Sequence, residues 1–166
     1  IDLAPALVSE LTGADPSRFA ALVAASGLGA MTAGFVLTRI PARRLVLTMN
    51  LAGALAGLTA MAVAASGVLA VTGALYVVLG FLATASVATS QSLFQLMVPD
   101  AYRGRVLSLW SAVGFGGHAL GALAVGWSAE RFGMAPSLVA AGSLCVAVSL
   151  GAMFLSPPDS SGEARG

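Results

Sequence analysis

Four polar side chains that could contact a solute recur along one apolar segment near the middle of the chain: Tyr76, Thr84, Gln91 and Gln95. At about 100° per residue of an α-helix they fall within an arc of about 100°, so they share one helix face. If this helix crosses a membrane, an unpaired amide is costly, and Gln91 must face protein or water rather than lipid. Two interpretations of this polar stripe stay open, hydrogen bonding between helices and a pathway for a solute.

His118 is the only histidine and lies near the middle of another apolar segment. A titratable group within a membrane span is a functional candidate, here for proton coupling. Its neighbours on the same helix face, at spacings of three and four residues, are the small residues Ser111, Gly114, Gly121 and Ala122. This surrounding favours a structural hydrogen bond on a packing face over proton coupling.

Small residues form similar faces on two predicted helices. Gly117 and Gly121 are four residues apart, a spacing that lets two helix backbones approach closely. An earlier segment repeats the pattern with Ala20, Ala24 and Met31 beside its glycines. We therefore predict a helix-packing seam at Gly27, Gly34, Gly114, Gly117 and Gly121.

Catalytic chemistry has little support. The sequence has no His/Cys/Glu set at metal-ligand spacing, no serine nucleophile elbow and no glycine-rich phosphate loop, so we expect no enzyme activity, metal or cofactor. The single cysteine, Cys145, has no disulfide partner within the chain and is interpreted as a packing residue. A net charge of +1 argues against a nucleic-acid partner.

The segments that carry these residues are almost free of charge. Residues 45–99 contain no Asp, Glu, Lys or Arg, and as one helix they would be about 80 Å long, against a hydrocarbon core of roughly 30 Å. This segment must therefore fold back, and Ser66-Gly67 is the plausible hinge. Charged residues make up 9% of the chain, against about 25% in typical globular proteins. The sequence predicts an integral, all-α, polytopic membrane protein embedded in a lipid bilayer.

Five segments are long and apolar enough to span a bilayer, roughly residues 19–37, 45–65, 69–98, 106–129 and 136–155. Residues 1–11 are apolar but supply only about half a span. Because the chain opens on Ile1 without a signal-peptide pattern, we expect it to be the C-terminal part of a longer protein. We assign residues 1–155 to an incomplete transmembrane half and residues 156–166 to a disordered cytoplasmic tail.

Arginine placement predicts the orientation. All eight basic residues are arginine, and they are distributed unevenly between alternate hinges. Short loops enriched in arginine face the cytoplasm, which predicts a plasma (bacterial inner) membrane protein whose C-terminus is cytoplasmic. The arginines predicted to be cytoplasmic are Arg39, Arg43, Arg44, Arg103, Arg105 and Arg165, whereas Arg18 and Arg131 lie on the other side.

Two junctions resemble those of a known transporter family. Residues 95–108 read QLMVPDAYRGRVLS and resemble the Q-x-x-V-P-D-x-x-R-G-R-V-x-S junction between the tenth and eleventh helices of major facilitator superfamily exporters. Residues 126–133 read GWSAERFG and are similar to the G-x-x-A-(E/D)-R-x-G at the end of the eleventh helix. The nearest branch is the enterobactin-exporter and macrolide-efflux type, the transmembrane secretion effectors. The loop-motif residues are Arg39, Arg43, Arg44, Pro99, Asp100, Arg103, Gly104 and Arg105.

A third region resembles the family less closely. Gly27, Gly29 and Gly34, followed by the arginine hinge, look like the eighth helix and the degenerate G-x-x-x-D-R-x-G-R-R loop. Thr38 stands where the aspartate would be and Pro41 where the glycine would be. This departure leaves the gating role of the loop open, whereas its role in orientation is retained.

The resemblance implies a fold and a mechanism. The chain would hold the end of helix 7 and helices 8–12 of the C-terminal half, partnered by the N-terminal six-helix half of the same protein. Such transporters rock the two halves around a midplane cavity, here to export small amphipathic, drug- or siderophore-like molecules with proton coupling. Asp2 lies about eleven residues, or roughly 16 Å, from the end of its helix near Gly13, close to the midplane. Asp2 is therefore the stronger proton-coupling candidate, and His118 the weaker.

Two other classes of protein remain as alternatives. A multi-span anchor or assembly subunit without transport would have packing faces but no polar stripe that converges on a cavity. A membrane-embedded enzyme would need a catalytic cluster, which the sequence lacks. Uptake rather than export is an alternative within the transporter class, and the substrate cannot be read from the sequence.

Overall fold

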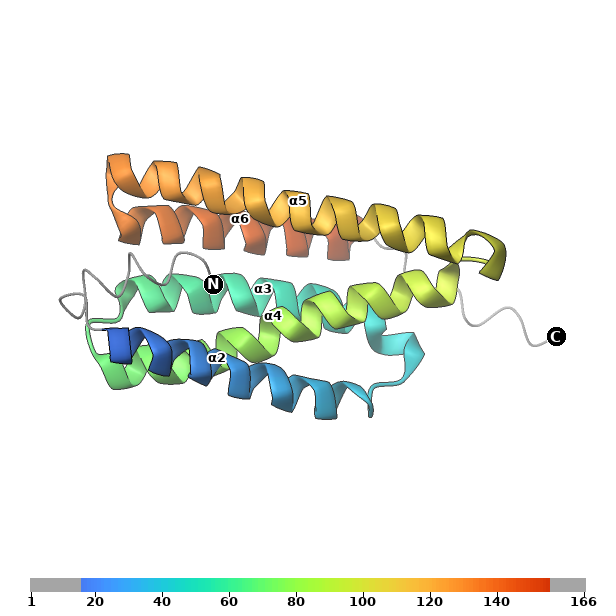
Figure 1. The fold of residues 1–166 in the computed structure, drawn as a ribbon, viewed down its shortest axis with the longest axis horizontal. Helices are drawn as coiled ribbons and strands as arrows, with labels where there is room; N and C mark the ends of the chain where they lie inside the picture. The colour runs from blue at the N-terminus through green and yellow to red at the C-terminus, as the bar shows by residue number, and fades with distance from the viewer. Residues whose placement is uncertain (1–15, 156–166) are drawn as a thin grey trace.

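The computed structural model describes residues 16–155, and every regular element within that range is helical (Figure 1). Five of these helices are long and apolar enough to cross a membrane. The prediction of an all-α, polytopic bundle is therefore confirmed. The elements are α2 (Pro16–Leu37), the 3₁₀ turn η1 (Ala42–Arg44), α3 (Leu45–Ala65), α4 (Leu69–Met97), α5 (Asp100–Phe132) and α6 (Met134–Leu155).

The predicted hinge separates α3 from α4. Helix α3 ends at Ala65, and Ser66 adopts an extended backbone. The Ser66 hydroxyl lies 2.8 Å from the Thr72 hydroxyl and also donates to the Val63 carbonyl. These bonds satisfy polar groups that the helix ends would otherwise leave open within an apolar environment.

The junction between α4 and α5 follows from proline chemistry. Val98 and Pro99 are extended, and the helix restarts at Asp100. Proline disfavours helical backbone in the residue before it, which stops α4 at this point. Asp100 lies in the first turn of α5, where its charge is favourable for the helix dipole, and it pairs with Arg103 at 2.6 Å.

Helix α6 begins two residues before the predicted position. Gly133 has a positive φ of 87°, a conformation that favours glycine, and it terminates α5. Because Gly133 makes this sharp turn, α6 starts directly at Met134, and Pro136 lies in the first turn, where a missing amide hydrogen costs little. The Ser137 hydroxyl donates to the Gly133 carbonyl at 2.8 Å and fixes this turn.

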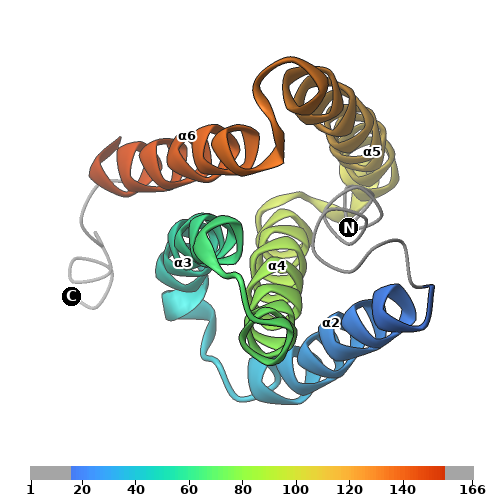
Figure 2. The same ribbon diagram turned by 90° about the vertical axis from the view of Figure 1, so that its left-hand side faces the viewer.

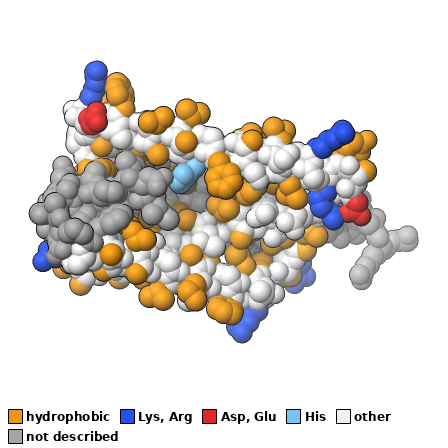
Figure 3. Space-filling model, in the orientation of Figure 1, with side chains coloured by type: hydrophobic (Ala, Val, Ile, Leu, Met, Phe, Trp, Pro, Cys, Tyr) orange, Lys and Arg blue, Asp and Glu red, His pale blue; other side chains and the backbone are white. Residues whose placement is uncertain are grey.

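The helices form two layers. Helices α5 and α6 lie on one side of α2, α3 and α4 (Figures 1 and 2). They diverge from the turn that joins them, and α6 packs mainly against α3 (Figure 2). Successive helices alternate in direction, so the α2–α3 and α4–α5 junctions lie at the same end of the bundle (Figure 1). Charged side chains lie at the helix ends, and the lengths between them are largely apolar (Figure 3).

Two helix pairs approach closely through glycine. A Cβ added to Gly80 of α4 would overlap the Ser26 backbone of α2, and one added to Gly29 of α2 would overlap the Val77 carbonyl of α4. In the second pair, a Cβ on Gly57 of α3 would lie 2.6 Å from the carbonyl oxygen of Gly142 in α6, and the reverse distance is also 2.6 Å. Only glycine permits this approach, which strengthens dispersion contacts between helices that lipid alone would not drive together.

Helix α5 is covered least. Within the described residues it has no buried side chain, whereas Leu22, Val63, Tyr76 and Met134 form a core cluster between the other helices. Phe115 of α5 is 79% exposed. Apolar side chains around this helix are therefore available to lipid or to protein outside the described residues.

Candidate functional site

Three adjoining cavities meet around Val87, near the middle of α4, and we call them together the Val87 hollow. Val87 lines all three, and Trp110 of α5 lines two of them. Their volumes are about 290, 280 and 330 Å³. The second and third of these cavities therefore lie where α4 faces α5, and the first lies on the adjoining surface of α4.

The first cavity contains part of the predicted polar stripe. Thr84 and Gln91 line it together with Ala83, Val87 and Ala88, all from α4. The sequence spacing predicted that Thr84 and Gln91 share a face, and the structure brings them to one surface. This cavity offers a neutral amide and a hydroxyl to a solute.

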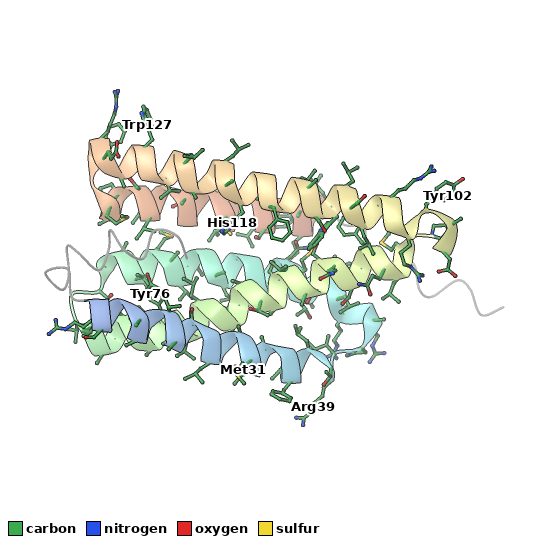
Figure 4. All side chains as sticks on the ribbon, viewed as in Figure 1. Met31, Arg39, Tyr76, Tyr102, His118 and Trp127 are labelled. Carbon is green, nitrogen blue, oxygen red and sulfur yellow. The ribbon has the colours of Figure 1, made fainter. Side chains whose placement is uncertain are left out.

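The second cavity is mainly aromatic. It is lined by Trp110, Phe115 and His118 of α5, with Ser111 and Gly114 of the same helix. His118 lies between the two layers in the view of Figure 4. Aromatic faces combined with one imidazole suit the apolar body of an amphipathic molecule.

The third cavity adds polar groups from three helices. It is lined by Asn50 of α3, Ser86 and Ser90 of α4 and Ser149 of α6, with Trp110 at the α5 side. Asn50 is only 6% exposed. The Ser86 hydroxyl donates to the Met49 carbonyl across the helix interface at 3.4 Å, a long hydrogen bond.

Within residues 16–155, His118 is the only titratable side chain that lines the Val87 hollow. Among the described residues, no arginine, aspartate or glutamate lines any of the three cavities. A neutral lining of hydroxyls, amides and aromatic rings favours uncharged or weakly charged molecules, because an unpaired charge in such a site is costly to desolvate.

The other two members of the polar stripe lie elsewhere. Tyr76 is 6% exposed and packs against Leu22, Val63 and Met134, and Figure 4 shows it at the opposite end of α4 from the α5 junction. Gln95 is exposed and lines none of the three cavities. Of the four stripe residues, Tyr76 is therefore a core residue, Thr84 and Gln91 line a cavity, and Gln95 lies outside the three cavities.

The predicted glycine seam makes no close contact within the described residues. A Cβ on any of its five members would meet nothing within 4 Å. The described glycines at which an added Cβ would come within 3 Å of another helix are Gly29, Gly53, Gly57, Gly80 and Gly142. The seam thus stays a prediction for contact with protein outside the described residues; its members are Gly27, Gly34, Gly114, Gly117 and Gly121.

The alternating helix directions bring the arginine-rich junctions to one end of the bundle. The hinge between α2 and α3 and the start of α5 lie at one end of the bundle, whereas the last turn of α5, which contains Arg131, lies at the other end (Figure 1). There its guanidinium lies 4.8 Å from the centre of the Trp127 ring, a cation–π contact. The loop residues at the first end are Arg39, Arg43, Arg44, Pro99, Asp100, Arg103, Gly104 and Arg105.

Only one of the two proton-coupling candidates lies within the described residues. Asp2 lies outside the described residues, as does the tail 156–166. His118 lines the second cavity and also has an interaction partner. Among residues 16–155 no group of three His, Cys, Asp or Glu side chains could hold a metal ion.

Asn50 is the site residue that sequence reasoning missed. It is the only asparagine in the chain, and an amide within a predicted span is a signal of function or of interhelical bonding. Its importance depends on the neighbours from α4 and α6, which the helix periodicity of α3 alone does not reveal.

Comparison with known proteins gives one result for the chain as a whole. A family model described as Major Facilitator Superfamily matches residues 3–166. No curated protein and no solved structure matches the chain.

Proposed function

This chain belongs to the major facilitator superfamily of membrane transporters, and from that premise we propose that it exports small amphipathic organic molecules. The Val87 hollow is the observation that supports this proposal. Its walls combine aromatic rings with neutral hydrogen-bonding groups between the two helix layers. An amphipathic molecule needs both kinds of surface, and a purely structural anchor needs neither.

We propose that the N-terminal six-helix half of the same protein completes this cavity. Helix α5 supports the proposal, because its large apolar side chains are exposed along its length, among them Leu109, Val113 and Leu123. The five seam glycines would let the partner half approach α2 and α5 closely. Alternating access would follow from rocking one half against the other.

The orientation and the coupling ion are further parts of the proposal. The arginine-rich end of the bundle would face the cytoplasm of a bacterial inner membrane. Export would be driven by protons, with Asp2 as the principal coupling residue and His118 as the alternative. The branch would be the one that includes enterobactin exporters and macrolide-efflux proteins, on the strength of the junction at 95–108.

Gln91→Leu should lower export several-fold without affecting membrane insertion. The amide is one hydrogen-bonding group of the Val87 hollow, and losing one such bond costs about 1 kcal/mol, or roughly fivefold in binding. The measurement is export of a panel of uncharged and cationic fluorescent dyes from liposomes that contain the full-length transporter.

Ser92→Ala is the matched control for this change. Ser92 is the next residue on α4, but its hydroxyl already donates to the Ala88 carbonyl at 2.9 Å and lines none of the three cavities. Equal losses of export in Gln91→Leu and Ser92→Ala would contradict a solute pathway along this face.

A further inference from the structure

Most serine and threonine hydroxyls in these helices bond to their own helix. Ser26, Thr59, Thr89 and Ser128 are examples, each donating to a carbonyl three or four residues earlier at 2.5–2.9 Å. This back-bonding satisfies a hydroxyl in an apolar environment and leaves it no donor for other partners.

The hydroxyls of the Val87 hollow behave differently. Within the described residues, Thr84, Ser90, Ser111 and Ser149 make no hydrogen bond to a carbonyl of their own helix, and each lines one of the three cavities. Ser86 instead reaches across to another helix through its long bond to Met49. Free hydroxyl donors are therefore concentrated where a solute could use them.

Asn50 is the most buried polar group of the third cavity. It is 6% exposed, yet its amide has no hydrogen-bond partner among the described residues. Every fully enclosed polar side-chain atom of that part of the chain does have a partner. The Asn50 amide must therefore open onto the cavity, with Ser86, Ser90 and Ser149 around it.

The chemistry of this cluster selects one kind of ligand group. An asparagine amide both donates and accepts, and serine hydroxyls do the same. In the part of the chain that the structure describes, no charged side chain lines this cavity, so an ionised group would lose its hydration without finding a partner there. Trp110 at the α5 side adds an aromatic face beside the polar cluster. An uncharged amide or alcohol attached to an aromatic body matches these features.

We propose that Asn50, Ser86, Ser90 and Ser149 form a hydrogen-bonding subsite, set at the junction of α3, α4 and α6, for an uncharged amide or alcohol group of the transported molecule. The subsite rests on the proposed function, since it is one wall of the Val87 hollow. It goes further by assigning helices α3 and α6, which otherwise pack against each other through Gly57 and Gly142, a part in ligand selection.

The test compares two probes of similar size. 2-Naphthamide carries the uncharged amide, and 2-isopropylnaphthalene replaces it with an apolar group of the same number of heavy atoms. Equilibrium dialysis measures both against the full-length transporter in lipid nanodiscs, with empty nanodiscs subtracted. The wild type should bind the amide about tenfold more tightly, because a polar site left unpaired rejects the apolar analogue.

Variants identify the groups responsible. Asn50→Leu should abolish the preference, so that both probes bind with about the same affinity. Ser149→Ala should lower the preference for the amide probe about threefold. Thr59→Val is the matched control on α3, because its buried hydroxyl already bonds to the Leu55 carbonyl, and it should keep the wild-type preference. If Asn50→Leu does not fold, Ser149→Ala in α6 and Ser90→Ala in α4 test the subsite instead, because each should lower the preference for the amide probe.

The outcomes separate this proposal from the proposed function. No preference in the wild type, or a preference unchanged in Asn50→Leu and Ser149→Ala, would overturn the subsite even if dyes are still exported. A preference that depends on Asn50, in a transporter that exports no dye of the panel, would support the subsite and overturn export as the function.

Discussion

Gly80→Ala should prevent most of the protein from folding, although it adds a single methyl group. The added Cβ would overlap the backbone of Ser26 on the neighbouring helix. A flexible side chain could move aside, but a helix backbone cannot, so the α2–α4 pair must separate. Overpacking of this kind costs about 1–3 kcal/mol, and here the pair also loses its close approach. The measurement is the yield and thermal unfolding temperature of the full-length transporter in detergent.

Gly151→Ala is the control for Gly80→Ala. Gly151 lies in α6, and a Cβ there would meet nothing within 4 Å. Alanine is the better helix former by about 1 kcal/mol, so this variant should be neutral or slightly stabilised. If Gly80→Ala were as stable as Gly151→Ala, the close crossing of α2 and α4 would be wrong.

The second large effect concerns proton coupling. Asp2→Asn should abolish uphill export driven by a pH gradient while it preserves substrate binding and downhill exchange. The amide keeps the size of the carboxylate and its hydrogen bonding but cannot titrate. Transport of a dye into inverted vesicles measures uphill export with a pH gradient and downhill exchange without one, and equilibrium dialysis of the same dye measures substrate binding.

His118→Gln separates the two coupling candidates. Glutamine retains a hydrogen-bonding group at this position in the second cavity, so the effect should be smaller than that of Asp2→Asn. Uphill export that survives in Asp2→Asn but disappears in His118→Gln would reverse the assignment. Survival in both variants would move coupling to the N-terminal half.

The helical spans could be predicted closely from the sequence. Charge-free runs have no stable alternative to a membrane helix, and prolines, glycines and the Ser66-Gly67 hinge set their ends. The largest differences are at α5, which extends from Asp100 to Phe132 rather than over 106–129. This helix continues past its apolar part because backbone hydrogen bonding does not end where the charged residues begin.

The packing contacts could not be predicted in the same way. These helices are apolar on most sides, so no single face identifies the neighbour. Glycine is frequent in membrane helices, and the sequence alone does not distinguish Gly80, which contacts Ser26, from Gly34, which contacts nothing described. Which glycine is used depends on the crossing point of two helices, a tertiary property.

The site was predictable only in part, for a similar reason. Periodicity within α4 correctly put Thr84 and Gln91 on one surface. The same periodicity included Tyr76, but the positions of α2 and α6 bury that ring. Asn50 and Ser149 come from helices with no polar stripe, and only the three-helix junction brings them together.

Accessibility of Val87 from the two sides of the membrane decides whether the Val87 hollow is a pathway for a solute. The experiment introduces Val87→Cys into the full-length transporter in a Cys145→Ser background, which retains a donor for the Gly53 carbonyl. Ala42→Cys and Gly67→Cys, in loops at opposite ends of the bundle, calibrate reaction with a membrane-impermeant maleimide added to one side at a time. Ala42→Cys should react only from the cytoplasm and Gly67→Cys only from outside.

An alternating-access cavity predicts that Val87→Cys reacts from either side and is protected by a transported dye. Leu58→Cys, on an exposed face of α3 that lines none of the three cavities, should react from neither side. Reaction of Val87→Cys from one side only, or no reaction at all, would contradict a solute pathway through the Val87 hollow.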